Sequence, residues 1–503
     1  MLSRAPVRVG IVLAIPLEIL LGLAICQPNV TGRWSTALHP LPINPVHVAL
    51  LANGKILVIA GSGSCPPWQS GCPSGPLYGP SNHSGALLWD PGAENYTQWF
   101  ALTWDMFCNG MVPLRDGRVF IDSGSIQYDP FLGERRTSIF NPSTNTFTNG
   151  PTMAHGRWYP TLLTLGDGRV MAFSGFTETG NTNNSVEFYT IGSGWSPQYV
   201  ASWTPDLYPH LHLLPSGKIF YSGAETLSKK FDPSTKTWSD VAITRFGNSR
   251  PYGTSVLLPL SPGDIPRAKV MIMGGNNPAT NTTEIINLSA ATPTWVYGPN
   301  MSQARVQLNA VLLPNGKVLI VGGSRNDEDV STASYRAEIY DPVRNAITSA
   351  GVYSFPRLYH SVALLLPDAT VWVAGSNPDR GVYTRQIEIY KPAYLFTSTG
   401  AAASRPNLAN VPSIISYGST FTLATPDAAN IPIQRGVVLV RNGAVTHAFG
   451  MDQREVQLAY TVGTGSLIVK VPSNRNVLPP GYYMLFLLSR SGVPSIAKFL
   501  RVR

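Results

Sequence analysis

Several side chains with redox or metal-binding chemistry occupy related positions in the sequence. Counting nine residues back from the glycine of successive polar turns reaches Cys, Tyr, Tyr and Gln, and a further copy offers Tyr followed directly by His. These residues are Cys108, Tyr159, Tyr208, Gln307, Tyr359 and His360. Phenol and imidazole groups suit a tetragonal Cu(II) ion, and a thiol beside a tyrosine points to redox chemistry. Tyrosines also line protein channels for packing, so the residue types alone leave a structural and a redox interpretation open.

These positions belong to a repeated phrase that brings them together. Each of seven copies has a short apolar run, a polar turn that usually ends in glycine, and a second apolar run, as in VHVALLANGKILVIAGSG from Val46 and YPTLLTLGDGRVMAFSGF from Tyr159. The pattern is typical of a β-hairpin, and a repeat of about 50 residues is typical of kelch-type propeller blades. We therefore predict a seven-bladed kelch-type β-propeller over residues 30–395, in which equivalent strand starts meet around one mouth of the channel.

The composition favours an all-β fold. Only 13% of the residues are charged and 44% are hydrophobic, while 46 Gly and 43 Pro favour short strands and turns over long helices. After about residue 400 the phrase stops, and apolar segments such as 437–441 and 456–460 predict a small immunoglobulin-like β-sandwich over residues 400–503. The net charge of +9 comes from scattered basic residues, so we expect no nucleic-acid partner.

The N-terminus has the pattern of a secretory signal peptide. Arg4 and Arg8 precede a mostly apolar stretch at 9–25, and polar residues follow from Gln27. We predict a cleaved leader over residues 1–26 and secretion of the mature protein, with a membrane anchor as the alternative.

Cysteine usage after the leader is consistent with export. Cys65 and Cys72 are close enough in sequence to form a local disulfide, which leaves Cys108 as an unpaired thiol in an oxidising compartment. Asn-X-Ser/Thr sequons fit a secreted glycoprotein. They lie at Asn29, Asn82, Asn95, Asn183, Asn281, Asn287 and Asn300.

Longer motifs around the candidate residues resemble those of the copper radical oxidases, the family that includes galactose oxidase and glyoxal oxidase. They extend over almost the whole predicted mature chain, in the order and domain setting of that family. The motifs are FC at 107–108, RWY at 157–159 before DGR at 167–169, RLYHS at 357–361, THA at 446–448 with DQR at 452–454, and PPGYYML at 479–485.

The resemblance implies a copper centre with a cofactor built from the chain itself. It implies that Cys108 is joined to Tyr159 by a thioether, that Tyr159 is both a copper ligand and the radical, and that Tyr359 is the axial ligand and the base. His360 and His447 would be the imidazole ligands, with a loop of the sandwich carrying His447 into the channel. Oxidation of an alcohol or a hydrated aldehyde takes two electrons, so copper and the Tyr159 phenol would each store one, and O2 would leave as H2O2.

Departures from galactose oxidase bear on the substrate. Phe176 stands in the stretch where galactose oxidase has a tryptophan over the radical, and His210 follows Tyr208 where that enzyme has a sugar-binding arginine. We therefore expect galactose to be disfavoured, and Phe176, Tyr208, His210 and Gln307 are the candidate pocket residues.

These observations together predict an extracellular oxidase of small aldehydes or primary alcohols, closest in layout to glyoxal oxidase because the first copy of the repeat starts soon after the leader. An alcohol or carbohydrate oxidase of the galactose oxidase type and a non-catalytic propeller that binds glycans or proteins are the alternatives. O2 is the expected co-substrate, peroxidases that consume H2O2 are the expected functional neighbours, and a monomer is expected.

Overall fold

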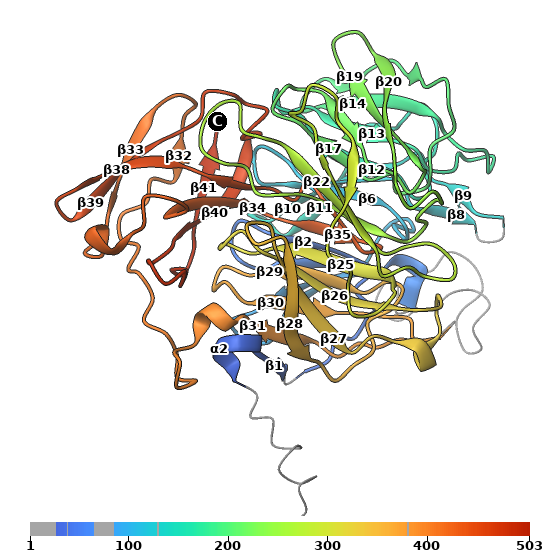
Figure 1. Ribbon diagram of the computed structural model, residues 1–503. Coiled ribbons are helices and arrows are strands. Elements are labelled where there is room, and N and C mark those ends of the chain that lie inside the picture. Colours follow the sequence, from blue (N-terminus) through green and yellow to red (C-terminus); the bar gives the residue numbers. More distant parts are fainter. Residues whose placement is uncertain (1–26, 38, 65–84, 128–129, 380–381) are drawn as a thin grey trace, which may run out of the picture.

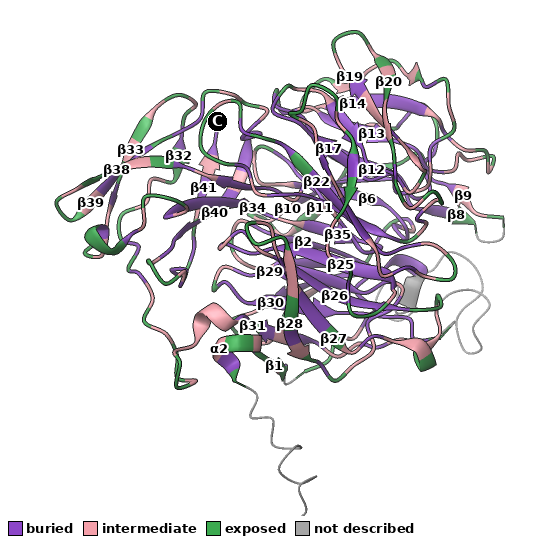
Figure 2. Ribbon diagram, viewed as in Figure 1, coloured by how far each residue is buried: buried purple, intermediate pink, exposed green. Residues whose placement is uncertain are grey.

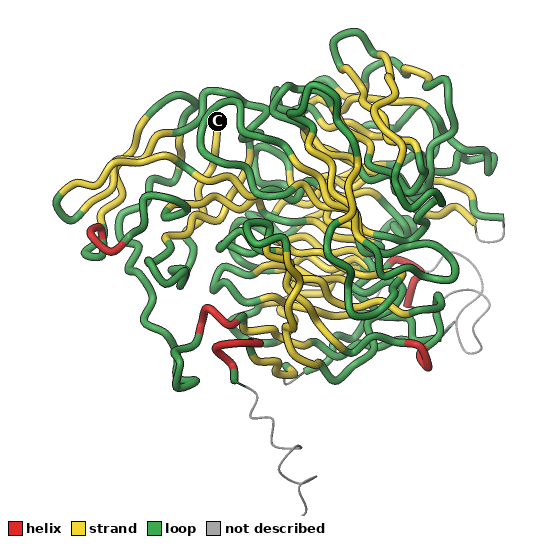
Figure 3. The backbone as a smooth tube through the Cα atoms, viewed as in Figure 1, coloured by secondary structure: helices red, strands yellow, loops and turns green. Residues whose placement is uncertain are grey.

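The chain folds almost entirely into β-structure in a computed structural model, which describes residues 27–37, 39–64, 85–127, 130–379 and 382–503 (Figure 1). In these ranges the only α-helix is the single turn α2, Pro28–Thr31, and short 3-10 segments lie at Gly61–Ser64, Val330–Thr332, Ala393–Leu395 and Ala428–Asn430 (Figure 3). The described residues contain no helix that could span a bilayer. The all-β prediction is confirmed, while the leader at 1–26 and the Cys65–Cys72 pair lie outside the described residues.

Seven antiparallel sheets occupy the described residues between 33 and 391, each built mainly from consecutive strands. The first holds β2 (His47–Leu50), β3 (Ile56–Ile59), β4 (Ala86–Asp90) and β5 (Asn95–Phe100); the second β6 (Gly110–Pro113), β7 (Val119–Asp122), β10 (Thr137–Asn141) and β11 (Thr146–Asn149); the third β12 (Thr161–Thr164), β13 (Val170–Phe173), β14 (Ser185–Thr190), β15 (Gly194–Trp195) and β16 (Tyr199–Val200). The fourth holds β17 (Leu211–Leu213), β18 (Ile219–Tyr221), β19 (Leu227–Asp232) and β20 (Thr237–Ile243); the fifth β21 (Thr254–Leu257), β22 (Lys269–Met273), β23 (Thr283–Asn287) and β24 (Trp295–Tyr297). The sixth holds β25 (Val306–Leu312), β26 (Val318–Ser324), β27 (Arg336–Asp341) and β28 (Ala346–Val352); the seventh β29 (Val362–Leu365), β30 (Val371–Ala374), β31 (Glu388–Lys391) and β1 (Arg33–Thr36). A separate hairpin, β8 (Ser125–Gln127) with β9 (Leu132–Gly133), follows β7.

In six of the seven sheets the first two strands are joined by a tight polar turn, and in the fifth a longer connection joins β21 to β22. Gly117, Gly168, Gly217 and Gly316 have φ values of +92°, +85°, +83° and +79°, a region that favours glycine because it has no Cβ. Each of their N–H groups donates to the carbonyl three residues earlier, at 2.8 to 3.0 Å. The positive φ therefore explains why glycine recurs at this turn position of the repeated phrase.

Burial decreases from the first strand of a sheet to the last (Figure 2). All residues of β2 and β3 are buried, whereas β5, β11 and β20 are exposed or half-buried throughout. The apolar runs of the phrase thus form the inner strands, and polar fourth strands face solvent.

The sheets are arranged so that their first strands approach one another. The neighbours are β2 with β6, β6 with β12, β12 with β17, β21 with β25, β25 with β29, and β29 with β2. Between β17 and β21, the hydroxyl of Ser255 lies 2.7 Å from Nε2 of His212. The early strand β1 completes the seventh sheet by pairing with β31, from Arg33 opposite Lys391 to Thr36 opposite Glu388.

The C-terminal part of the chain forms two further sheets, separate in Figure 1 from the seven. One contains β32 (Ile414–Ile415), β41 (Lys498–Val502), β40 (Gly481–Leu487), β34 (Val437–Arg441) and β37 (Glu455–Gln457); the other contains β33 (Thr420–Ala424), β39 (Ser466–Lys470) and β38 (Ala459–Gly463). Leu423, Leu467, Leu439 and Leu500 pack in one apolar core between these sheets.

A hairpin from this C-terminal part enters the ring of first strands. Its strands are β35 (Ala444–Thr446) and β36 (Phe449–Met451), and β35 extends the first sheet by pairing with β2, with Thr446 opposite His47. The hairpin also approaches β6, β12, β21, β25 and β29. The expectation that a segment of the sandwich enters the channel is therefore correct, and the segment is a hairpin rather than an irregular loop.

The residues that follow the hairpin anchor it to the seven sheets. Asp452 pairs with Arg441 at 2.9 Å and accepts the Thr164 N–H at 3.0 Å, so it joins the hairpin base to β12. The Gln453 amide bonds the backbone of β25 at Leu312 (2.6 Å) and Ala310 (3.0 Å). The DQR motif thus fixes the position of His447 from outside the site.

Four buried Arg–Glu pairs fix the segments that lead into the first strands. In each pair an arginine just before a first strand reaches a glutamate on the third strand of the same sheet. The pairs are Arg157–Glu187 (2.8 Å), Arg250–Glu284 (2.8 Å), Arg305–Glu338 and Arg357–Glu388 (2.8 Å). Loss of one partner would leave a buried charge uncompensated, at a cost of about 3–5 kcal/mol.

Candidate metal centre

A left-handed backbone conformation recurs at the residues that the repeat places around the channel mouth. The residues and φ values are Cys108 (+63°), Tyr159 (+68°), Tyr208 (+47°), Tyr252 (+56°), Gln307 (+59°) and His360 (+60°). This conformation costs a residue with a side chain about 1 kcal/mol or more, so its recurrence indicates a shared structural requirement.

Backbone hydrogen bonds link these left-handed residues from one sheet to the next. The Tyr159 N–H donates to the Cys108 carbonyl (3.1 Å), and the Tyr208 N–H donates to the Tyr159 carbonyl (2.9 Å). The Gln307 N–H likewise donates to the Tyr252 carbonyl at 2.8 Å. The bonds run around the ring and place Cys108 and Tyr159 side by side.

The structure corrects the expected position of Tyr359. In the seventh sheet the turn residue with positive φ is Ala369 (+65°), whose N–H donates to the Leu366 carbonyl as the turn glycines do. Counting back nine residues from it gives His360, which is the left-handed residue, whereas Tyr359 pairs with Asn377 as Trp158 pairs with Phe176. The absence of a turn glycine in this copy caused the shift of one residue.

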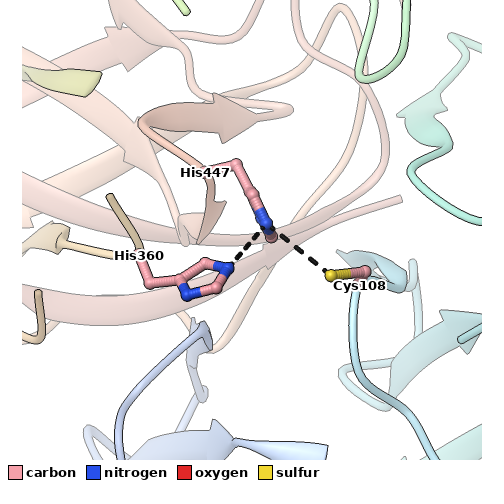
Figure 4. Close-up of side chains that lie close together, drawn as sticks. All are labelled: Cys108, His360 and His447. Atoms are coloured by element: carbon pink, nitrogen blue, oxygen red, sulfur yellow. Dashed lines mark hydrogen bonds between the residues drawn. The ribbon is translucent and has the colours of Figure 1, made fainter. Parts of the chain in front are cut away.

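Two phenols and two imidazoles converge beside one thiol. The hydroxyls of Tyr159 and Tyr359 are in contact, and Nε2 of His360 lies 3.0 Å from Nε2 of His447. The Cys108 thiol also lies near His447, with Sγ 3.8 Å from Nε2 (Figure 4). The structure thus brings together the five residues to which the sequence assigned the copper site and its cofactor.

Both imidazoles are oriented by partners on their other ring nitrogen. Nδ1 of His360 lies 2.7 Å from Oδ1 of Asn377, and this oxygen also accepts from the Asn44 amide at 3.1 Å. Nδ1 of His447 lies 2.6 Å from Oγ1 of Thr446, whose hydroxyl donates to the Val46 carbonyl at 3.1 Å. These networks assign the ring protons to Nδ1, so each Nε2 carries a lone pair.

The donor atoms fit a copper ion. Two nitrogen lone pairs that face each other across 3.0 Å, with two phenol oxygens close together beside them, form a donor set that a cation among them would stabilise. Burial lowers the pKa of His360 to about 3 and that of His447 well below its usual value, so both rings stay neutral and able to coordinate. Imidazole and phenolate ligands in a tetragonal set suit Cu(II).

Burial also defines the state of the thiol and of one phenol. Cys108 is fully buried and unpaired, and burial raises the pKa of its thiol well above the usual value. Burial likewise raises the pKa of the Tyr359 phenol. Without a neighbouring cation both groups keep their protons, so thiolate or phenolate chemistry here needs a positive charge from a metal.

The aromatic cover over Tyr159 comes from a residue that the sequence analysis did not select. The Trp158 ring lies 3.7 Å from the Tyr159 ring, centroid to centroid, and it also stacks with Phe131 (4.2 Å) and Phe176 (5.7 Å). Phe176 therefore packs on Trp158, which in turn lies against Tyr159. The adjacency of Trp158 and Tyr159 in sequence was the available signal.

The other candidate pocket residues differ in where they lie. Tyr208 packs on Tyr159 (4.4 Å) and His447 (4.6 Å), and its hydroxyl donates to the Asn109 carbonyl at 2.8 Å. His210 is buried against Phe449 of the hairpin, with ring centroids 4.5 Å apart. Tyr208 thus borders the donor cluster, and His210 packs on the hairpin.

Gln307 is one of the left-handed residues around the channel mouth, next to Tyr252, whose carbonyl accepts its N–H. The Gln307 side chain is buried, and the Asp327 carboxyl is a polar neighbour. Tyr252, whose ring lies 6.5 Å from that of Tyr359, was not selected because the longer turn of its copy hides the nine-residue count. Asn377 and His47 carried no recognisable sequence signal.

Comparison with known proteins finds relatives that match both parts of the chain. The family model for the glyoxal oxidase N-terminus matches residues 80–394, and the model for the galactose oxidase-like early set domain matches residues 405–502. Galactose oxidase of Gibberella zeae is 28% identical over 95% of this chain and 71% of its own length. The aldehyde oxidase GLOX of Vitis pseudoreticulata is 30% identical over 69% of this chain and 72% of its own length.

A solved structure shares the fold. A fungal alcohol oxidase of the AA5 family, in complex with copper, matches with a TM-score of 0.80 at 23% identity, over 94% of this chain and 99% of that chain. The architecture is thus that of the galactose oxidase-like proteins, a propeller with a β-sandwich domain. Family models over most of the sequence, together with this fold and donor cluster, show that the chain belongs to the glyoxal oxidase and galactose oxidase family of copper radical oxidases.

Proposed function

We propose that this protein is an extracellular copper radical oxidase that oxidises small aldehydes or primary alcohols with O2 and forms H2O2. The observation that carries the proposal is the convergence of two neutral imidazoles and two phenols beside an unpaired buried thiol. A propeller that only binds a partner has no need for this set. Relatives named as galactose oxidase and as aldehyde oxidase support both substrate classes.

The proposal assigns each residue of the cluster a role. Tyr159, Tyr359, His360 and His447 would hold copper, and Cys108 would be joined to the Tyr159 ring by a thioether. Bound copper would supply one of the two redox equivalents of each turnover, and the Tyr159 phenol would supply the other. Sulfur on the ring would spread the unpaired electron and lower the potential of the phenol.

The chain's own groups would manage the substrate proton and the radical. The Tyr359 oxygen, in contact with the Tyr159 oxygen, is the acceptor for the hydroxyl proton of the substrate. The Tyr159 ring, covered by Trp158, would remove hydrogen from the substrate carbon. Asn377 and Thr446 would keep each imidazole proton on Nδ1 and so leave Nε2 free.

We also propose the finer architecture. The seven sheets along residues 33–391 would be the seven blades of one propeller over 30–395, closed by the pairing of β1 with β31, and the sandwich would occupy 400–503. The contacts between first strands of neighbouring sheets support this arrangement. Export is supported by the leader-like residues 1–26.

The test is oxygen consumption by copper-loaded, oxidised protein with a panel of small aldehydes and primary alcohols. We expect oxygen uptake with matching H2O2 and an absorption band of the radical that reductant removes. Cys108→Ser keeps all four proposed copper ligands and should lose the radical band and most activity. Absence of both oxygen uptake and radical absorption in the copper-loaded wild type would refute the proposal.

A further inference from the structure

A third buried histidine lies next to the centre without belonging to the donor cluster. His47, on β2, is fully buried, and its ring centroid is 5.9 Å from that of His447. It lies directly opposite Thr446, the residue that orients His447, in the pairing of β2 with β35. Its Nε2 accepts the backbone N–H of Cys108 at 2.9 Å.

This bond fills a gap in the ring of left-handed residues. The left-handed residues Tyr159 and Tyr208 each donate their N–H to the carbonyl of the left-handed residue in the preceding sheet. Cys108 follows the first sheet, where counting back nine residues from the turn glycine Gly54 reaches Pro45. Proline has φ fixed near −65° and cannot adopt the left-handed conformation, so the imidazole of His47 takes the place of the carbonyl acceptor.

The tautomer of His47 follows from this contact. Because Nε2 accepts, the ring proton lies on Nδ1, and Nδ1 has no hydrogen-bond partner within the described part of the chain. A buried donor without a partner is unfavourable for stability. A histidine is therefore a poor choice for packing alone at this position, and the use of Nε2 explains its presence.

We propose that His47 is a positioning residue for the formation of the Cys108–Tyr159 thioether. By holding the Cys108 amide, it fixes the left-handed backbone that directs the thiol toward the Tyr159 ring. The bond-forming step is the loss of the thiol hydrogen and of one ring hydrogen with two electrons, all accepted by O2: Cys–SH + ring C–H + O2 gives Cys–S–ring and H2O2. His47 takes no part in the electron transfer. This inference rests on the proposed function, which supplies copper and O2.

Two amide substitutions test the role of Nε2. The side-chain oxygen of glutamine can occupy the place of Nε2, whereas that of asparagine reaches only the place of Nδ1. We expect His47→Gln to retain the acceptor for the Cys108 N–H, and His47→Asn and His47→Leu to lose it. His212→Leu is the control, because His212 is also buried but bonds Ser255 on β21.

The measurement is the rate of thioether formation after copper-free, reduced protein is given copper and air. Digestion after Lys and Arg separates Cys108 from Tyr159 at Arg115 and Arg157, so a linked mass that lacks two hydrogens and survives reductant reports the bond. Loss of the acceptor of a buried N–H should slow linkage about tenfold in His47→Leu and His47→Asn. The rates of His47→Gln and His212→Leu should stay within about threefold of wild type.

A second readout is independent of copper. In the folded copper-free protein, iodoacetamide should alkylate Cys108 faster in His47→Leu than in His47→Gln, with thermal unfolding recorded to confirm that each variant is folded. Equal linkage rates in all His47 variants, or equal rates for the Gln and Asn variants, would overturn the positioning role. Absence of linkage in the wild type would instead refute the proposed function.

Discussion

Replacing Asn377 by Leu tests the orientation of the proposed copper ligands without removing any of them. Asn377 Oδ1 lies 2.7 Å from His360 Nδ1 and 3.1 Å from the Asn44 amide nitrogen. Leucine has a similar size and no acceptor. The change should free the His360 ring to rotate and to move its proton to Nε2, the nitrogen that faces His447 across 3.0 Å.

The size of the effect follows from what is lost. One hydrogen bond between neutral groups contributes about 0.5–1.5 kcal/mol, and loss of a partner that orients a metal-binding histidine typically weakens metal affinity about 10- to 100-fold. The Asn44 amide also loses its acceptor, but this penalty applies with and without copper. This penalty should therefore lower the melting temperature of the copper-free and the copper-loaded protein alike, and it should not change the free energy of copper binding.

The assay is a competition titration of copper between the protein and a chelator of known affinity, at pH 7. We expect the dissociation constant to rise about 10- to 100-fold in Asn377→Leu. Asn184→Leu is the matched control: the Asn184 side chain donates to the Ala201 carbonyl at 2.9 Å rather than to a proposed copper ligand, so the variant should keep wild-type affinity. Unchanged copper affinity in folded Asn377→Leu would refute the assigned tautomer and the orienting role.

Further expectations concern the radical, pH and metal removal. Trp158→Leu should shorten the lifetime of the radical absorption more than Phe176→Leu does, because the Trp158 ring lies directly against Tyr159 whereas Phe176 packs on Trp158; equal lifetimes would contradict this. Burial raises the pKa of Asp122 to about 8, so its stabilising contribution is full below about pH 4 and is lost as pH rises to 8. Asp122→Asn should therefore raise the melting temperature at pH 8 more than at pH 5, each pKa unit corresponding to about 1.4 kcal/mol. Chelation of copper should lower the melting temperature, and excess copper should restore it.

The repeated phrase made much of the arrangement predictable, because turn geometry and strand burial are local properties. The nine-residue interval before Gly117 and Gly168 placed Cys108 and Tyr159 in adjacent sheets, where a backbone bond now joins them. The same interval failed in the seventh copy. There Ala369 occupies the left-handed turn position that glycine usually takes, so no turn glycine was present from which to count.

Other parts of the site depend on contacts between distant segments, which periodicity does not encode. His47 and Asn377 act through single bonds to Cys108 and His360, and neither stands in a recognisable motif. Phe176 was proposed as the aromatic cover of Tyr159 because of its place after a strand. The ring that lies against Tyr159 is that of Trp158, and Phe176 packs on Trp158. The predicted sequon at Asn183 also shows this limit, since its side chain is buried and bonds Gly156 and Ser185.

The pairing of β2 with β35 has a consequence for the biosynthesis of the enzyme. The hydroxyl of Thr446 bonds the carbonyl of Val46, 400 positions away in the chain, and His447 is the next residue. Contacts between such distant segments form late in folding. A nascent chain that still lacks its last hundred residues therefore lacks one imidazole of the cluster, so the donor set is completed only when synthesis is nearly finished. A chain that is still being synthesised, or one truncated before His447, would consequently be unable to generate peroxide.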